Sequence, residues 1–208
     1  VGVAEGVAGD VDAEVVLTVG TDCSVGKMTA STEIVRAARE RGVDAAIVAT
    51  GQTGVLVEGW GTAVDRVPGA FVAGAAEDLV LAGAARGRDL LVVEGQGSIV
   101  HPAYSAVTCG LLHGTMPDAL VLCHAAGREA VHGYESFPLL APGEYVDRYE
   151  RVAAPVRETS VVAGALNTAG LAGDEAAREA VDAYAAAVGA PATDPVRFDA
   201  GEVLDAVC

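Results

Sequence analysis

The chain has 208 residues, enough to bury a sizeable core in one domain without disulfides or a structural metal. Hydrophobic residues make up 51% and aromatic residues 4%, a globular composition that excludes disorder. The formal net charge of -16 excludes nucleic acid and anionic membranes as partners, because both require a basic surface, and no apolar stretch approaches the roughly 20 residues of a membrane span.

The first predicted element is a strand over residues 14–20, EVVLTVG, a β-branched run that ends at glycine. Residues 24–42 follow with apolar positions at helical spacing, and we expect this helix to stop near Gly42. VDAAIVAT at 43–50 then predicts a second strand. A strand, a loop and a helix therefore open the domain.

A glycine-rich stretch without a sustained period, residues 51–70, predicts a long loop that leaves the carboxyl end of a strand. Residues 71–86 predict a helix. DLLVVEG at 89–95 predicts a strand in the middle of the sheet, because it is too uniformly apolar to face water on either side.

The alternation of strands and helices continues to the end of the chain. We expect helices at 105–114, 144–153 and 173–188 with a short C-terminal one, strands at 118–124 and 160–166, and a loop over 125–143. This order implies right-handed crossovers and a parallel sheet covered on both faces. It predicts an α/β fold.

The motif GTDCSVGKMT connects the first strand to the first helix. Its glycines permit a tight turn whose amides converge on phosphate oxygens, and the lysine adds a point charge beside the positive end of the helix. The chain has twelve arginines but one lysine, Lys27, which lies in this motif and which we expect to be exposed. The predicted phosphate or cofactor ligands are Gly20, Thr21, Asp22, Cys23, Ser24, Val25, Gly26, Lys27, Met28 and Thr29. With the strand order, the motif predicts a P-loop NTPase-type three-layer sandwich with a mainly parallel sheet.

The motif departs from the pattern GxxxxGK[ST] in two places. Five residues separate Gly20 from Gly26, and Met28 stands where a metal-binding hydroxyl is usual, so Thr29 is the substitute we expect. The form GTD-x-x-VGK also resembles dethiobiotin synthetase-like P-loop enzymes, which activate a carboxylate with ATP. That resemblance covers this motif alone.

A second motif, VVEGQGSIVHP at 92–102, puts Glu94 at the end of the central strand, where a carboxylate can hold Mg²⁺ together with Thr29 or act as a base. His101 is predicted either as a base or as a structural histidine before a proline. Lys27, Glu94 and His101 are the candidate catalytic residues.

Polar residues in the other loops predict substrate contacts. Gln52 and Thr53 follow the second strand, and Gln96 follows Glu94. Arg128 is either a clamp for a substrate carboxylate or a surface arginine. Asp65 and Glu77 are either substrate contacts or surface acids.

Asn167 ends the fifth predicted strand, where its amide can read a purine edge, although turn chemistry explains such an asparagine equally well. The four cysteines and the histidines have no metal-like spacing, and there is no secretory leader, so we expect free thiols in a reducing cytoplasm. The acidic charge fits a protein kept soluble in high salt.

Five motifs in this order, VLTVGTDCSVGKMT, ATGQTG, AGAAEDLV, VVEGQGSIVHPAYS and ALNT, resemble a family of P-loop proteins long described as a domain of unknown function, which includes D-glutamate N-acetyltransferases. The resemblance runs from about residue 14 to 170. It implies that a Rossmann-like domain precedes the P-loop domain. On this basis 14–208 is the P-loop domain and 1–13 is a linker from a missing N-terminal domain.

The resemblance also implies acetyl transfer from acetyl-CoA to the amine of D-glutamate or a similar acidic amino acid. One alternative is an ATP- and Mg²⁺-dependent carboxylate–amine ligase of dethiobiotin synthetase type, which would use the same residues. The other is a nucleotide-sensing module without turnover. A homo-oligomer is compatible with each of these hypotheses.

Overall fold

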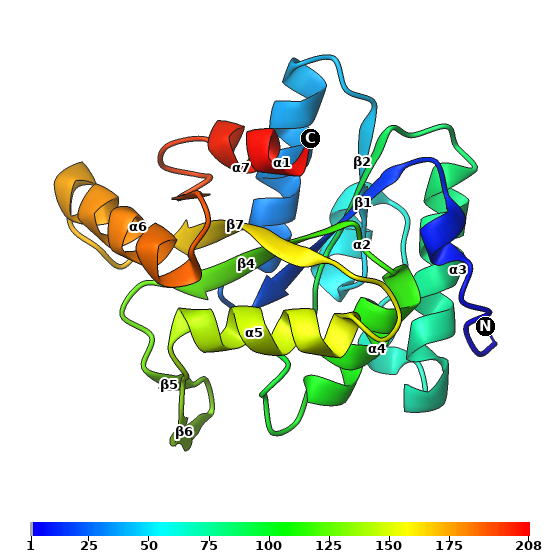
Figure 1. The fold of residues 1–208 in the computed structure, drawn as a ribbon, viewed down its shortest axis with the longest axis horizontal. Coiled ribbons are helices and arrows are strands. Elements are labelled where there is room, and N and C mark those ends of the chain that lie inside the picture. The colour runs from blue at the N-terminus through cyan, green and yellow to red at the C-terminus, as the bar shows by residue number, and fades with distance from the viewer. Residues whose placement is uncertain (1) are drawn as a thin grey trace.

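The computed structural model describes residues 2–208, and its centre is a parallel six-stranded sheet (Figure 1). The strand order is β2-β3-β1-β4-β7-β8, so the strand that leads into the P-loop lies between β3 and β4. These strands are β1 (Glu14–Gly20), β2 (Ala45–Val48), β3 (Leu90–Val93), β4 (Ala119–Ala125), β7 (Ser160–Asn167) and β8 (Ala192–Thr193). The predicted α/β fold is confirmed.

Seven α-helices, counted within residues 2–208, connect and cover these strands. They are α1 (Lys27–Glu40), α2 (Gln52–Glu58), α3 (Val72–Ala84), α4 (Ser105–Thr115), α5 (Pro142–Ala153), α6 (Asp174–Val188) and α7 (Gly201–Val207). Short 3-10 turns lie at η1 (Ala8–Asp10), η2 (Val64–Arg66) and η3 (Gly69–Phe71). None of the described helices combines the length and the apolarity needed to cross a membrane.

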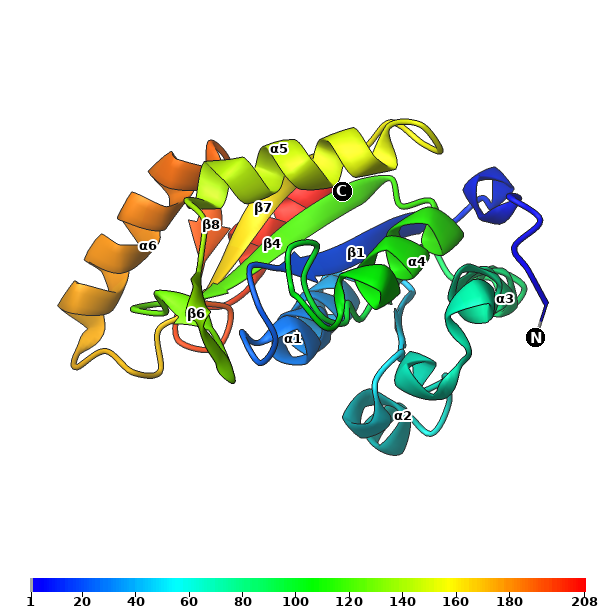
Figure 2. The ribbon, with the colours of Figure 1, turned by 90° about the horizontal axis from the view of Figure 1, so that it is seen from below.

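The sheet is covered on both faces, as its uniformly apolar strands require. Along β1, Val15, Leu17 and Val19 pack into a cluster that includes residues of α3, α4, α5 and α6, whereas Val16 packs with residues of α1 and α7. Figure 2 shows α5 and α1 on opposite sides of the sheet. The three-layer arrangement follows from the alternation of side chains along each strand.

Two segments predicted as loops contain regular structure. In 51–70 the chain forms α2 and two 3-10 turns, and Gly54 within α2 lies so close to Glu94 that a Cβ would overlap with the carboxylate. In 125–143 a hairpin is formed by β5 (Ala130–Val131) and β6 (Tyr134–Pro138), and its turn places Gly133 at a positive φ. Strand β8 was not predicted, because it has two residues.

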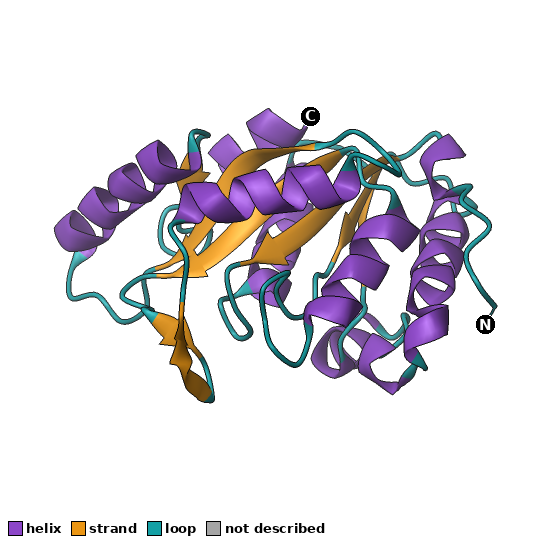
Figure 3. Ribbon diagram, turned by 60° about the horizontal axis from the view of Figure 1, so that its bottom comes forward, coloured by secondary structure: helices purple, strands orange, loops and turns teal. Residues whose placement is uncertain are grey.

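All paired strands of the large sheet run in one direction, so their carboxyl ends meet at one edge. Figure 3 shows the arrowheads of the central strands pointing to this edge, with the hairpin projecting beside it. The P-loop and the connections after β2, β3, β4, β7 and β8 all start there. This edge is where parallel sheets bind ligands.

The N-terminal segment is fastened to α3 by one buried carboxylate. Glu77 accepts the amides of Glu5 at 2.6 Å and Val7 at 2.7 Å. Burial raises the pKa of Glu77, but the hydrogen bonds from the backbone of residues 5–8 outweigh it, and the net pKa lies below the ordinary value. The carboxylate of Glu77 thus has a structural role, because it holds the N-terminal segment against α3. Of the predicted linker 1–13, residue 1 lies outside the described residues.

A Glu77→Gln variant is expected to lower the free energy of unfolding at pH 7 by about 2 kcal/mol, because hydrogen bonds to a charged group are lost. The wild-type contribution is present above the unfolded pKa of roughly 4.3 and is lost as the pH falls through the lower folded pKa. Urea unfolding at pH 7 and pH 3 measures both effects. Asp78→Asn, at the exposed neighbouring position, is the control and should change little. Equal losses in the two variants would contradict this role.

Candidate phosphate-binding site

The loop between β1 and α1 presents free amides at the start of a helix. Among residues 2–208, no protein acceptor is found for the backbone amides of residues 24–29. Gly26 caps α1 with a φ of 101°, a conformation that favours glycine, and Ser24 also has a positive φ. The unpaired amides and the helix dipole together make this loop the candidate anion site.

The lysine of this loop is folded inward. Lys27 Nζ donates to the carbonyls of Asp22 and Gly97, both at 2.8 Å, and the residue is 7% exposed. The expectation of an exposed loop lysine is therefore wrong, because acceptors from two loops draw the ammonium into the protein. Burial lowers the pKa of Lys27, and the nearby thiol and carboxylate groups only partly oppose this shift.

Asp22 is completely buried, and its hydrogen bonds link the P-loop to the segment that follows β4. Its carboxylate accepts the Cys23 amide at 2.7 Å, the His132 amide at 2.8 Å and Arg128 at 2.7 Å. Arg128 therefore already binds a carboxylate of the protein itself. Through these buried contacts Asp22 fixes the shape of the P-loop.

His101 lies under the loop rather than in an open cavity. It is 1% exposed, its Nδ1 accepts the Ala103 amide at 3.1 Å, and its Nε2 is 3.9 Å from Asp22 Oδ1. Because Nδ1 is an acceptor, the neutral ring carries its hydrogen on Nε2. Burial lowers the pKa of His101, so this neutral form is favoured.

Asp22, Cys23 and His101 each place a possible metal ligand within 4.8 Å of the others. The hydrogen bond that the Ala103 amide donates to His101 Nδ1 works against a metal ion there, because a metal on Nε2 would leave a hydrogen on Nδ1 facing that amide. Burial raises the pKa of the Cys23 thiol, which disfavours the thiolate that binds metals. We therefore interpret Asp22, Cys23 and His101 as residues that stabilise the P-loop.

A cavity of about 360 Å³, here called the Glu94 cavity, opens on one side of the P-loop. Several predicted site residues line it together. They are Cys23, Ser24, Gly26, Lys27, Met28, Gln52, Thr53, Glu94 and Gln96. This is the juxtaposition expected from the loops after β2 and β3.

Backbone amides fix the orientation of Glu94. Its Oε2 accepts the amides of Gly51 at 3.1 Å and Thr50 at 3.3 Å, and the Thr50 hydroxyl donates to the Glu94 carbonyl. Gln96 Nε2 in turn donates to the Thr50 hydroxyl at 3.2 Å. Glu94 is buried but lines the cavity, so its side chain borders the cavity in a fixed orientation.

A second cavity of about 370 Å³, here called the Asn167 cavity, lies on the other side of the P-loop. Its walls include Gly26 and Thr29 of the loop, Asn167 after β7 and Arg197 after β8. Gly26 lines both cavities. Thr29 and Glu94, the predicted Mg²⁺ ligands, therefore line different cavities, and Met28 brings no oxygen to the Glu94 side.

Several supporting residues were not predicted. The Tyr149 hydroxyl donates to the Gly20 carbonyl at 2.7 Å and accepts the Ile99 amide at 3.0 Å. These two bonds link α5 to the start of the P-loop and to the loop after β3. Thr18 accepts the Gly95 amide at 3.0 Å and lies 3.1 Å from the Ser31 hydroxyl. Sequence patterns gave no signal for these residues, because each looks like an ordinary core position.

The remaining predicted residues have local partners. Gln52 Nε2 donates to Asp65 at 2.9 Å, so Asp65 positions a residue of the Glu94 cavity. Thr21 shares a hydrogen bond of 2.8 Å with His124. The four cysteines are free thiols, and burial raises the pKa of Cys123 to about 12, which leaves it inert.

Residues 2–204 match the model of a family described as a domain of unknown function, the DUF1611_C P-loop domain. Two curated proteins named D-glutamate N-acetyltransferase, from Pseudoalteromonas sp. and Tritonibacter scottomollicae, are 39% and 38% identical over 196 residues. These alignments cover 92% of this chain and 57% of each relative. The chain thus spans little more than half the length of these relatives.

A crystal structure of a DUF1611 family protein from Anabaena variabilis superposes with a TM-score of 0.94 at 43% identity, covering 99% of this chain and 60% of that one. The signal recognition particle 54 kDa protein of Aeropyrum pernix, solved in complex with GDP, superposes with a TM-score of 0.55 at 15% identity, covering 94% and 48%. The second similarity concerns the fold alone, and it confirms the predicted P-loop NTPase-type sandwich.

Proposed function

This chain belongs to the family of DUF1611 P-loop domains, and on that premise we propose that it is the phosphate-binding domain of an N-acetyltransferase that transfers the acetyl group of acetyl-CoA to the amine of D-glutamate or a related acidic amino acid. The two relatives named D-glutamate N-acetyltransferase support the reaction. The P-loop with its free amides supports the use of a phosphorylated donor. Since the chain spans 57% of those relatives, the activity is proposed for a protein in which this domain is joined to a second one. The resemblance of the sequence motifs implies that this second domain is Rossmann-like.

The two cavities suggest how the coenzyme is oriented. Its diphosphate would lie on the amides of residues 24–29 beside Lys27, and Gly26 borders both cavities at this point. The adenosine end would enter the Asn167 cavity, where the Asn167 side chain meets the base, and the acetyl thioester would enter the Glu94 cavity. Gln52, Thr53 and Gln96 would then face the amino acid.

In the Glu94 cavity we assign the carboxylate of Glu94 as the base that takes a proton from the substrate ammonium. The amine nitrogen then attacks the thioester carbonyl and the C–N bond forms. The C–S bond breaks, the departing sulfur takes the second proton of the attacking nitrogen, and coenzyme A leaves as a thiol. Lys27 and the loop amides hold the phosphates. His101 would support the loop through Asp22 rather than act on the substrate, since both of its nitrogens face protein groups.

The donor set supports the coenzyme over Mg²⁺-ATP. A Mg²⁺ ion prefers several oxygen ligands, and Met28 occupies the hydroxyl position of the usual P-loop. Thr29 and Glu94 are the two predicted Mg²⁺ ligands, but Thr29 lines the Asn167 cavity. A metal ion beside the acetyl group in the Glu94 cavity would therefore meet only Glu94 of the two. Acyl transfer from a thioester needs no metal.

Two incubations of the protein joined to its second domain test this function. With acetyl-CoA and D-glutamate, but without ATP, we expect release of free thiol. With ATP, Mg²⁺ and the amino acid, we expect no phosphate. Phosphate release with no thiol would favour the ligase, and neither product would favour a sensing module.

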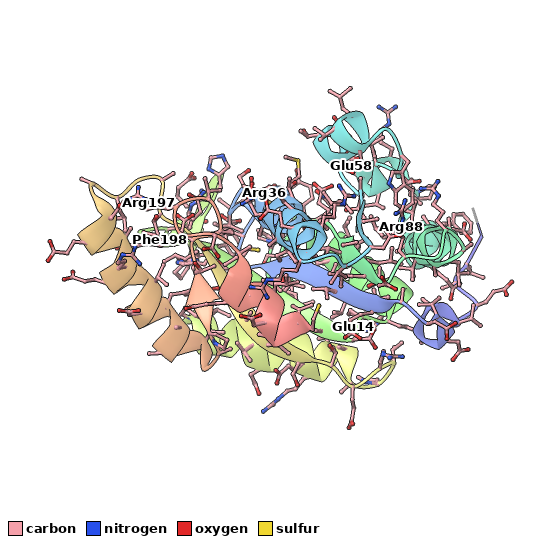
Figure 4. All side chains as sticks on the ribbon, turned by 90° about the horizontal axis from the view of Figure 1, so that it is seen from above. Glu14, Arg36, Glu58, Arg88, Arg197 and Phe198 are labelled. Carbon is pink, nitrogen blue, oxygen red and sulfur yellow. The ribbon has the colours of Figure 1, made fainter. Side chains whose placement is uncertain are left out.

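A Glu94→Gln variant is expected to lower the rate of thiol release about a hundredfold, because general base catalysis contributes at least this factor. Its affinity for coenzyme A should stay within about threefold of the wild type, since Glu94 contacts no phosphate in the proposed arrangement. Glu58→Gln, on the projecting helix α2 (Figure 4), is the control with the same change of charge. An unchanged rate in Glu94→Gln would rule out this base.

A further inference from the structure

The wall of the Asn167 cavity contains one acidic residue, Asp194, and the carboxylate of Asp194 is hydrogen-bonded to groups of the protein itself. Asp194 accepts the amides of Thr168, Val196 and Arg197, each at 3.0 Å, together with the Thr168 hydroxyl. Burial alone would raise the pKa of Asp194, but these hydrogen bonds hold it below the ordinary value. The carboxylate therefore organises the loop after β8 and leaves the cavity open to an anion.

Arg197 supplies the positive charge of this cavity. Its guanidinium donates to the carbonyls of Gly173 at 2.8 Å and Leu171 at 3.3 Å, and its nearest carboxylate, Asp174, is 3.4 Å away and 74% exposed. Figure 4 shows Arg197 beside the start of α6, next to Phe198. Carbonyl partners orient a guanidinium without neutralising it, and an exposed pair is weak. The charge of Arg197 is thus available to a ligand.

Asn167 adds a neutral donor near the P-loop. Its Oδ1 accepts the Ala169 amide at 3.0 Å, whereas within residues 2–208 its Nδ2 has no hydrogen-bond acceptor. The nearby walls formed by Val25, Ala30 and Ala165 are apolar. The cavity thus offers apolar walls, one amide donor and one cation. These features suit a flat heterocyclic base and an anionic group attached close to it.

We propose that the Asn167 cavity binds the nucleoside end of coenzyme A and that Arg197 recognises the phosphate monoester on its ribose. This inference rests on the proposed function and adds the residue that selects the donor. A nucleoside triphosphate carries its phosphates in one chain, which the P-loop can hold alone. Coenzyme A carries a diphosphate and a separate ribose 3′-phosphate. Lys27 and Arg197, which line the cavities on the two sides of the P-loop, match a ligand with two separate anionic groups.

The test compares coenzyme A with 3′-dephospho-coenzyme A by equilibrium binding to the wild type and to Arg197→Gln. We expect the wild type to bind coenzyme A about tenfold more tightly than the dephospho form. Arg197→Gln should lose this preference while it keeps the affinity for 3′-dephospho-coenzyme A within about twofold. Arg197→Lys, which keeps the charge, should retain part of the preference.

Arg178→Gln is the matched control. Arg178 lies on α6 with its guanidinium 4.1 Å from the centre of the Phe198 ring, and it lines a different cavity. It should leave both affinities unchanged. If Arg197→Gln weakened both ligands equally, Arg197 would only hold the loop, and the inference would be overturned while the proposed function stood. If the wild type bound neither ligand, both proposals would fail.

Discussion

A Lys27→Met variant is expected to bind coenzyme A on the order of a hundredfold more weakly than the wild type and to show no measurable acetyl transfer. The ammonium is the side-chain cation of the P-loop, and hydrogen bonds to charged groups are worth about 3 kcal/mol at most, which corresponds to roughly this factor. Methionine keeps much of the volume of the lysine side chain. Isothermal titration with coenzyme A measures the loss, and unchanged affinity would remove the basis for a phosphate site.

The stability of this variant should change by no more than about 2 kcal/mol, because two effects oppose each other. The carbonyls of Asp22 and Gly97 lose their donor. However, the pKa of Lys27 is lower in the folded chain, so its charge opposes folding below that pKa, and the variant lacks this penalty. Arg151→Met, which removes an exposed charge on α5, is the control for binding and stability.

A Gly95→Ala variant is expected to lower the free energy of unfolding by about 3 kcal/mol or more and to be recovered poorly as folded protein. A Cβ at this position would overlap with the backbone carbonyl of Thr18 in the central strand β1. The neighbouring strands fix this carbonyl, so the loop after β3 has to move. The move would break the hydrogen bond from the Gly95 amide to the Thr18 hydroxyl.

Gly69→Ala provides the comparison, because a Cβ there meets nothing within 4 Å. Chemical denaturation of the two variants should separate them clearly, with Gly69→Ala within about 1 kcal/mol of the wild type. If both variants unfolded at the same denaturant concentration, the close approach of Gly95 to β1 would be refuted.

The sequence predicted the parts of the fold that repeat a strong local pattern. The apolar run of β1, the glycines after it and the periodic helix α1 are local signals, and they placed the P-loop correctly. α2 was missed because Gly54 weakens its helix propensity. Position 54 needs a glycine because a Cβ there would overlap with the Glu94 carboxylate. Glu94 lies some forty residues further along the chain, so no local pattern reveals this contact.

The site was predictable where a residue follows a recognisable strand. Gln52, Glu94 and Asn167 were predicted in this way, and the structure brings Gln52 and Glu94 to one cavity and Asn167 to the other. Arg197 was missed because β8 is too short to predict. The buried position of Lys27 depends on the Gly97 carbonyl, an acceptor that only tertiary structure brings near.

The central position of β1 has a consequence for how the chain folds. Val16 pairs with Val92 on one side and with Ala119 on the other, so the first strand gains its second neighbour only after more than half of the 208 residues have been synthesised. Such pairings between distant residues are formed slowly, since loop closure costs entropy before any contact forms. During this interval the apolar β1 is exposed to other chains. We therefore expect refolding to be slow and its yield to fall as protein concentration rises.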